Sequence, residues 1–187
     1  MSPLSYGIAE NTFTRVEPVF HSLYICPTIQ PHFSQHTRLM ESRKAIVRHV
    51  KDLTFIAKAG SNHWTTVDSS HHGNMPAATS PMELILIALG ACTGSDVVSI
   101  LEKKRARLVR FEVAITGVRA KEYPKVYTEI HLEYRFSGEG MREKDVKHAI
   151  ELSMTKYCSV SAMLKKSVHV TYSYAITKGS AETTQVD

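Results

Sequence analysis

Apolar and polar residues alternate with a period of two along several stretches of the chain, which is the pattern of half-buried β-strands. The clearest stretch ends near Gly138 and has a mainly apolar side and a charged side. The apolar side comprises Val126, Ile130, Leu132, Tyr134 and Phe136, and the charged side Glu129, His131, Glu133 and Arg135. The pattern predicts a hairpin of residues 45–58 and 62–68 that turns at Gly60-Ser61-Asn62. It also predicts three further strands, over residues 108–119, 125–136 and 168–176.

Two helical segments are predicted between these strands. Ser80 is a typical N-cap residue, a proline follows it, and Glu83 stands where a capping box has its acidic member. This helix is expected to run to about Lys104. A second helical stretch begins near Lys144 and has apolar residues at helical spacing, at Val146, Ile150, Met154, Tyr157 and Leu164. The order β-β-α-β-β-α-β predicts an α+β domain with two long core helices.

The first helix is apolar almost all round, because it contains the uninterrupted run Leu84, Ile85, Leu86, Ile87, Ala88 and Leu89. A single sheet would cover only one side of it, and each large side chain left in water forgoes about 1.5–3 kcal/mol. We therefore expect a homodimer that buries these helices between subunits. The apolar run is bounded by Glu83 and Asp96 and is shorter than the roughly 18 residues of a membrane span.

The net charge of +5 in 187 residues does not by itself indicate a nucleic-acid partner. Positive residues are scattered, and the one dense group falls at the expected end of the first helix, where cations favour the helix dipole. That group comprises Lys103, Lys104, Arg105, Arg107 and Arg110. We expect neither a nucleic-acid partner nor a membrane partner.

Residues 1–41 differ from the rest of the chain in being rich in proline, lacking lysine and having no steady period. We predict that they form a poorly ordered extension, or that translation begins at Met40. An organelle-targeting peptide is the competing explanation. Residues 42–177 would then form the domain, and residues 178–187 a C-terminal tail.

The three cysteines, Cys26, Cys92 and Cys158, are too few for a secreted disulfide scaffold and lack the CxxC spacing of a zinc site. No signal peptide is visible, so a reducing, cytoplasmic compartment is expected. Cys26 lies in the extension and is expected to be a free thiol without a role. No metal and no cofactor are predicted.

The chemistry is expected to lie in the other two thiols. Cys92 stands between Gly90 and Gly94 in the first helix, and taken alone it is better explained as a small core residue among closely packed glycines. The second helical stretch passes through Cys158, next to a restart of the helix where nearby N–H groups would lower the thiol pKa. Two buried thiols on two core helices suit a cycle in which one attacks a peroxide and the other closes a disulfide.

Four segments resemble the OsmC/Ohr family of osmotically inducible and organic hydroperoxide resistance proteins, above all its YhfA-like branch. They are residues 80–84 (SPMEL), 90–92 (GAC), 96–101 (DVVSIL) and 157–160 (YCSV), with the two cysteines 66 positions apart. The resemblance covers about residues 42–177 and implies an OsmC-like fold, an intertwined homodimer and a stress-response peroxidase for small organic hydroperoxides. By position, Cys92 resembles the peroxidatic cysteine and Cys158 the resolving one. A dithiol reductant, of which a lipoyl group is one type, would reset the pair.

Two functional positions depart from the family pattern. In the well-studied peroxidases, a glutamate just after the helix-starting proline pairs with an arginine that lowers the thiol pKa. Here Met82 follows the proline, and no arginine lies between Leu53 and Ser80. Asp96, four residues after Cys92, shares its helix face and would support the site from beside the thiol while disfavouring a thiolate.

A cation must be supplied from elsewhere if Cys92 is to react quickly. The candidates for stabilising its thiolate, from either subunit, are Lys58, His63, His71 and His72. A solvated loop is the favoured explanation of the two adjacent histidines. His63, beside Trp64, could equally be a packed strand residue.

Three functional hypotheses follow. The first is a thiol peroxidase with Cys92 and Cys158 as its redox pair. The second is a non-catalytic module of the same fold that binds a small apolar or thiol-reactive ligand between the long helices, an idea favoured by the missing Arg/Glu pair. The third is a metal site made by both cysteines with His63 or His71, which has little support because the ligands lack motif spacing.

Overall fold

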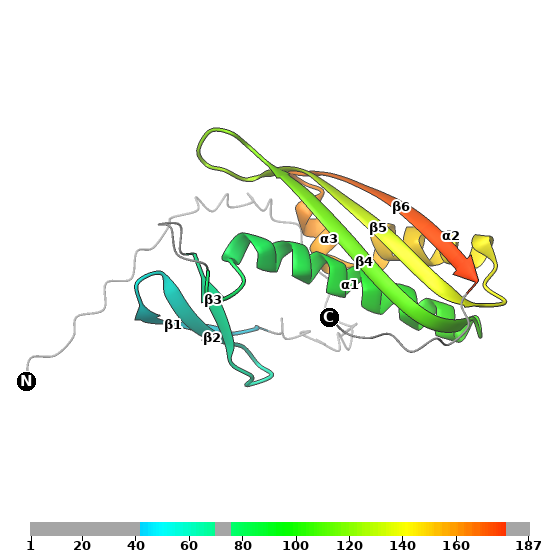
Figure 1. Ribbon diagram of the computed structural model, residues 1–187, viewed down its shortest axis with the longest axis horizontal. Coiled ribbons are helices and arrows are strands. Elements are labelled where there is room, and N and C mark those ends of the chain that lie inside the picture. Colours follow the sequence, from blue (N-terminus) through cyan, green and yellow to red (C-terminus); the bar gives the residue numbers. More distant parts are fainter. Residues whose placement is uncertain (1–41, 70–75, 179–187) are drawn as a thin grey trace, which may run out of the picture. The chain divides into compact units, whose positions relative to one another are not determined.

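The computed structural model, which describes residues 42–69 and 76–178, contains both helices and strands (Figure 1). This mixture confirms the predicted α+β class. The described elements are β1 (Ile46–Lys51), β2 (Thr54–Lys58), β3 (Thr65–Asp68), α1 (Pro81–Lys103), β4 (Arg107–Arg119), β5 (Tyr127–Glu139), α2 (Glu143–Leu152), the π-helical turn η1 (Ser153–Tyr157), α3 (Ser159–Leu164) and β6 (His169–Lys178).

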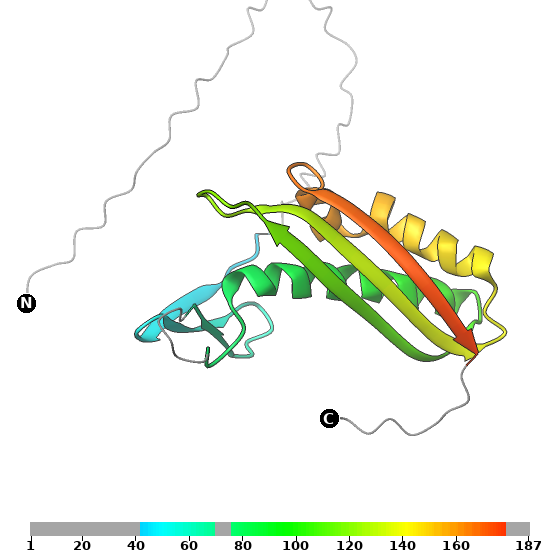
Figure 2. The ribbon, with the colours of Figure 1, turned by 45° about the horizontal axis from the view of Figure 1, so that its top comes forward.

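The main sheet has the order β4-β5-β6 and carries the core on one face. β5 pairs with β4 antiparallel and with β6 parallel, with Phe136 opposite both Phe111 and Ile176. Helices α1, α2 and α3 lie together on one face of this sheet (Figures 1 and 2). The core between them is built of fully buried residues from every layer, including Leu89, Val97, Leu101, Leu132, Tyr134, Val146 and Ile150.

The alternation predicted for β5 is confirmed over most of its length. Ile130, Leu132, Tyr134 and Phe136 are buried toward the helices. The prediction is wrong for Val126, which precedes the strand and is 51% exposed. Its place is taken by Tyr127, because the pairing with β4 shifts register between Val118 and Arg119. The Tyr127 hydroxyl donates to the Met82 carbonyl at 3.0 Å and so ties the strand to the start of α1.

The first predicted hairpin is two hairpins in the structure. The stretch 45–58, predicted as one strand, turns at Asp52 and Leu53, so that β1 and β2 pair antiparallel with Lys51 opposite Thr54. Asp52 has a φ of 52°, and aspartate is one of the few residues that tolerate this left-handed conformation. The second turn lies near Asn62, as predicted, and β2 pairs with β3.

Helix α1 begins as predicted and ends one residue before Lys104. The Ser80 N–H donates to Glu83 Oε2 at 2.7 Å, and the Glu83 N–H donates back to Ser80 Oγ at 3.4 Å, which is a complete capping box. By length and composition α1 could cross a bilayer. Leu89, Val97 and Leu101 are nevertheless at most 1% exposed against the sheet and the other helices, which is typical of a core helix.

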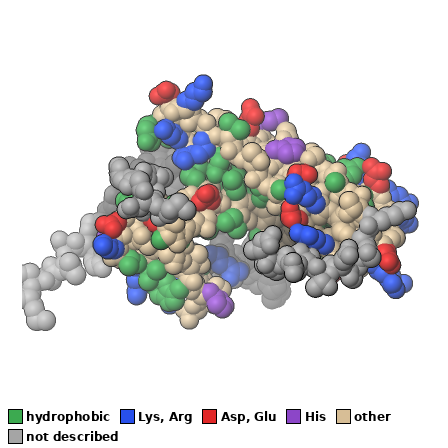
Figure 3. Space-filling model, viewed as in Figure 1, with side chains coloured by type: hydrophobic (Ala, Val, Ile, Leu, Met, Phe, Trp, Pro, Cys, Tyr) green, Lys and Arg blue, Asp and Glu red, His purple; other side chains and the backbone are tan. Residues whose placement is uncertain are grey.

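One side of α1 is not covered by any other described part of the chain. Ile87 is 53% exposed, and Ala88 and Ala91 on the same side are exposed as well. Hydrophobic side chains gather at the surface over the N-terminal half of this helix (Figure 3). The solvent-exposed apolar side predicted for this helix is therefore present. The homodimer that would cover it remains a prediction.

Candidate functional site

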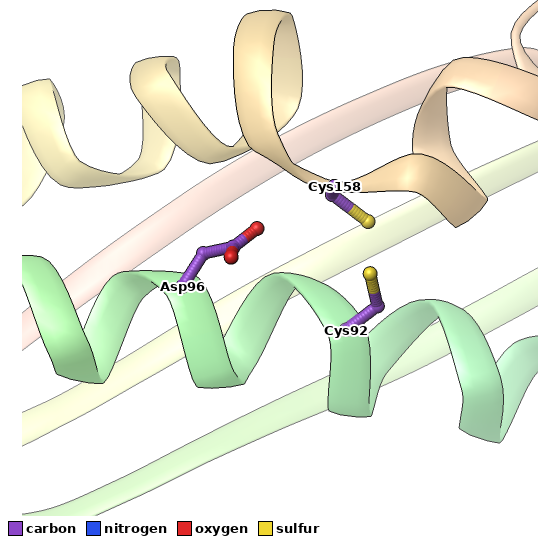
Figure 4. A group of neighbouring side chains, drawn as sticks. All are labelled: Cys92, Asp96 and Cys158. Atoms are coloured by element: carbon purple, nitrogen blue, oxygen red, sulfur yellow. The ribbon is translucent and has the colours of Figure 1, made fainter. Parts of the chain in front are cut away.

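Cys92 and Asp96 stand one helical turn apart on the side of α1 that faces the segment from α2 to α3. Positions i and i+4 share a helix face, so both side chains reach toward that segment. Cys158 comes from the junction that follows η1, and its sulfur points at the sulfur of Cys92 (Figure 4). The two Sγ atoms and a carboxylate oxygen of Asp96 all lie within 4.8 Å of one another. Residues 66 positions apart in sequence thus form one cluster.

The glycines that flank Cys92 serve packing rather than access to the sulfur. A Cβ on Gly90 would lie 2.5 Å from Ile115 Cδ1, and one on Gly94 would lie 3.3 Å from Phe111 Cε1. Both glycines are buried and let α1 approach β4 closely. This is the packing explanation weighed for the sequence motif, and it holds for the glycines although Cys92 itself faces the second thiol.

Cys158 interrupts the second helical stretch, which the sequence predicted to pass through it. The backbone widens into the π-helical turn η1, becomes extended at Cys158, and restarts as α3 with Cys158 as its N-cap. The Ser161 N–H donates to Cys158 Sγ at 3.2 Å. Cysteine therefore takes the capping role usual for serine or aspartate, which orients its sulfur toward α1.

Burial controls the ionisation of Cys158. The residue is 3% exposed, and this burial, together with the neighbouring Cys92 thiol, raises the pKa of Cys158 to about 11. The hydrogen bond from the Ser161 N–H acts in the opposite direction, as the sequence predicted. It is outweighed, so the expectation of a lowered pKa is wrong in sign, and Cys158 is a protonated thiol at neutral pH.

Asp96 is held in place by a serine that the sequence analysis missed. Ser153 is fully buried, and its hydroxyl donates to Asp96 Oδ2 at 2.9 Å. The signal was present, since Ser153 is a polar residue on the apolar side of the second helical stretch. Its neighbour Met154 was assigned only to the core, but Met154 Sδ accepts hydrogen bonds from the hydroxyls of Tyr134 (3.6 Å) and Ser161 (3.8 Å).

A cleft of about 340 Å³ opens beside Asp96. It lies along α1 and α2 and reaches η1 at Tyr157. Its lining is mixed, with apolar, hydroxyl and basic side chains from Asp96, Ser99, Ile100, Lys103, Lys104, His148, Leu152 and Tyr157. Water and small solutes can therefore approach the cluster from the Asp96 side.

The predicted cations are not part of this cluster within the described chain. Lys58 donates to Asn62 Oδ1 at 2.7 Å and lies 5.0 Å from the centre of the Trp64 ring. His63 is exposed in the loop between β2 and β3. His71 and His72 lie outside the described residues. The metal hypothesis with His63 is also not supported, because the third ligating side chain beside the two described thiols is Asp96.

Comparison with known proteins identifies the fold. The model of the family described as "OsmC-like protein" matches residues 71–173. Protein YhfA of Escherichia coli is 40% identical over 133 residues, which cover 71% of this chain and 97% of YhfA. The chain belongs to the OsmC-like family. This confirms the family and the fold that the sequence motifs implied.

Two solved structures extend the comparison with OsmC-like proteins. A hypothetical protein from Aquifex aeolicus is 32% identical with a TM-score of 0.68, covering 75% of this chain and all of its own. An organic hydroperoxide resistance protein OsmC from Legionella pneumophila is 14% identical with a TM-score of 0.56, covering 73% and 98% of the two chains. The second likeness shows a shared fold alone.

The departure of this OsmC-like chain from the peroxidase pattern has a structural explanation at Met82. Met82 is partly buried and packs against the hydrophobic core, where a carboxylate would be partly desolvated. Glu83 is exposed and its carboxylate is engaged with the Ser80 N–H, which lowers the Glu83 pKa. Neither residue reproduces a glutamate paired with an arginine at the thiol.

Proposed function

We propose that this OsmC-family protein is a thiol peroxidase that reduces small organic hydroperoxides through a disulfide between Cys92 and Cys158. The observation that carries the proposal is the approach of the two sulfurs to within 4.8 Å, across the contact between α1 and the η1–α3 junction. A disulfide requires about 2.05 Å between sulfurs, so a shift of a few ångströms closes it. Both thiols are free in the reduced protein.

The exposure of the two thiols supports the proposed order of their reactions. Cys92 is partly exposed whereas Cys158 is buried, so a hydroperoxide meets Cys92 first. The Cys92 thiolate attacks the terminal peroxide oxygen, the O–O bond breaks, and the leaving alkoxide takes a proton to become an alcohol. Cys158 then attacks the sulfenic sulfur, the S–O bond breaks, and water leaves. A dithiol reductant restores both thiols by exchange.

The surface around α1 supports the proposed homodimer. A hollow of about 1020 Å³ runs along this helix and β4 and is lined mainly by apolar residues, including Leu86, Ile87, Phe111, Val113 and Ile115. A second copy placed over the exposed side of α1 would bury much of this apolar surface. A reducing compartment such as the cytoplasm would keep the thiols ready.

A second candidate function is a non-catalytic module that binds a small apolar or thiol-reactive ligand between the long helices at the proposed dimer interface. The specific observation in its favour is Met82, which packs into the core where the peroxidase pattern has a glutamate. Such a protein would bind its ligand without consuming hydroperoxide in repeated turnovers.

Hydroperoxide consumption with a dithiol reductant separates the two functions. Wild type should turn over an organic hydroperoxide faster than hydrogen peroxide, whereas Cys92→Ser should fall to the uncatalysed rate. Cys158→Ser should lose steady-state turnover but keep the first oxidation step. Cys26→Ser is the matched control and should behave as wild type. Equal rates in wild type and Cys92→Ser would reject the peroxidase and leave the binding module.

A further inference from the structure

Three metal-ligating side chains converge in the reduced cluster. Cys92, Asp96 and Cys158 offer two sulfurs and a carboxylate oxygen that are mutually within 4.8 Å. A tetrahedral zinc ion with Zn–S of about 2.3 Å and Zn–O of about 2.0–2.2 Å holds such donors roughly 3.5–3.8 Å apart. The cluster therefore needs only a small closure to surround a cation of this size.

We propose that the reduced protein binds one Zn²⁺ through Cys92, Cys158 and Asp96. Two thiolates and a carboxylate suit Zn²⁺ and are a poor set for Mg²⁺ or Ca²⁺, which prefer oxygen ligands. The inference goes beyond the proposed peroxidase and needs only the free thiols and the carboxylate. It replaces the histidine-containing metal site considered from the sequence.

The groups around the three ligands support them as an outer shell does at metal sites. The Ser153 hydroxyl fixes the Asp96 carboxylate through Oδ2 at 2.9 Å. The Ser161 N–H donates to Cys158 Sγ at 3.2 Å, a bond that stabilises a metal-bound thiolate. Each ligand other than Cys92 is thus oriented by a hydrogen bond before any ion arrives.

The surroundings also provide an access route and a fourth ligand position. Cys158 closes the cluster on its buried side, while Cys92 is partly exposed and the cleft of about 340 Å³ reaches Asp96. An ion can reach the site through this cleft. Three protein ligands then leave one position of the tetrahedron to water, the arrangement of an open zinc site.

Metal binding and disulfide formation exclude each other. Binding of Zn²⁺ displaces the protons of both thiols, so two protons are released for each ion bound. An organic hydroperoxide removes two electrons from the two sulfurs, takes up two protons, and becomes an alcohol and water. The resulting disulfide has no thiolate left to donate, so the zinc ion is released. The cluster would therefore couple metal release to peroxide.

Cobalt substitution in the reduced, full-length protein tests the site. One equivalent of Co²⁺ should produce the near-ultraviolet sulfur-to-cobalt absorption and visible bands of a tetrahedral thiolate complex, which Zn²⁺ should abolish and excess Mg²⁺ should leave unchanged. Asp96→Asn keeps the shape and an acceptor for Ser153 but should weaken binding by at least about tenfold. Glu102→Gln, an exposed acid on the same helix, is the matched control.

Two measurements on the wild-type protein test the site without relying on variants that could misfold. Protein oxidised beforehand to the disulfide should bind no cobalt, and hydroperoxide added to the zinc-loaded protein should release zinc to a chromogenic chelator in proportion to thiols lost. Tight cobalt binding that persists in Cys92→Ser, or an absence of thiolate absorption in reduced wild type, would overturn the inference. If reduced wild type shows no thiolate absorption with cobalt but still forms the disulfide, only the metal site is rejected. If the protein binds zinc but does not turn over peroxide, only the peroxidase is rejected.

Discussion

The two segments that carry the cysteines are built differently. Cys92 stands in the middle of the regular 23-residue helix α1, where every neighbouring N–H is engaged in the helix. Cys158 stands between the five-residue π-helical turn η1 and the short helix α3, where an N–H remains free to bond its sulfur. The same side chain thus has a partly exposed place in a rigid element and a buried place at a backbone irregularity.

This difference supports the distinct roles proposed for the two thiols. A thiol on a packed helix keeps its position while a substrate approaches it. A thiol beside a π-helical turn lies where the backbone already departs from regular geometry, a frequent feature of functional sites. The few ångströms needed to join the sulfurs are therefore expected to come from the η1–α3 segment rather than from α1.

The largest expected effect is a difference in thiol reactivity. At pH 7 a thiol with the Cys158 pKa of about 11 is about one part in ten thousand thiolate, against about 3% for an ordinary cysteine. Iodoacetamide should therefore label Cys158 about two orders of magnitude more slowly than an ordinary thiol. The Cys158 rate should rise with pH until about 11.

Peptide mass spectrometry of timed samples measures these rates. Urea-unfolded protein is the control, in which Cys92 and Cys158 should react alike. Rapid labelling of Cys158 that levels off below pH 9 would contradict the asymmetry between the two segments.

Much of the framework was readable from sequence because it depends on local signals. The capping box at Ser80 and Glu83, the apolar face of β5, and the shared face of Cys92 and Asp96 each follow from residue spacing alone. The two cysteine motifs also identified the family, and thereby the expectation that Cys92 would meet Cys158.

The sequence predictions are wrong or incomplete where the backbone angle or the packing of other elements determines the structure. The extra turn at Asp52 was missed because only Lys51 and Asp52 separate the apolar residues Val50 and Leu53, and the positive φ of Asp52 is what distinguishes the turn from a strand. The sequence predicted the restart of the helix next to Cys158, but the π-helical turn before it was missed because it leaves the apolar spacing unbroken. The sign of the Cys158 pKa shift depends on burial by other elements, which no local motif records.

Packing around Cys92 should make the α1 segment sensitive to cavities. Leu89 is fully buried one turn before Cys92, so Leu89→Ala should lower the free energy of unfolding by about 2–5 kcal/mol. Urea unfolding followed by circular dichroism measures this loss. Val118→Ala, at a side chain that is 51% exposed, should stay within about 0.5 kcal/mol of wild type. A similar small effect for Leu89→Ala would show that α1 is not the rigid partner.

A substitution in η1 should lower the free energy of unfolding by less than the cavity at Leu89 does. Met154→Leu conserves volume but removes the sulfur that accepts from the hydroxyls of Tyr134 and Ser161, so a loss of about 1–2 kcal/mol is expected. Met163→Leu, at a residue that is 62% exposed, is the matched control. An unfolding experiment in which both variants equal wild type would remove the support for Met154 as a hydrogen-bond acceptor.

The smallest effect concerns the ion pair that links the end of α1 to α2, the helix that precedes η1. Lys104, which follows α1, donates to Asp145 of α2 at 3.0 Å, and this bond, with Arg142, lowers the Asp145 pKa below its usual value. A carboxyl group whose pKa is lowered by folding stabilises the folded state at a pH above its unfolded-state pKa. This stabilisation is lost as the pH falls through the folded-state pKa. The stability difference between wild type and Asp145→Asn should therefore be present at pH 7 and shrink in acid. A difference independent of pH would exclude the ion pair as its cause.

Intact mass tests most directly whether the sulfurs of Cys92 and Cys158 react as one unit. Reduced wild type treated with one equivalent of an organic hydroperoxide should lose the mass of two hydrogens, and peptide mapping should place the bond between Cys92 and Cys158. Cys158→Ser should instead gain one oxygen at Cys92, and Cys92→Ser should remain unchanged. Wild type that keeps an added oxygen at Cys92 with Cys158 still a free thiol would contradict the account.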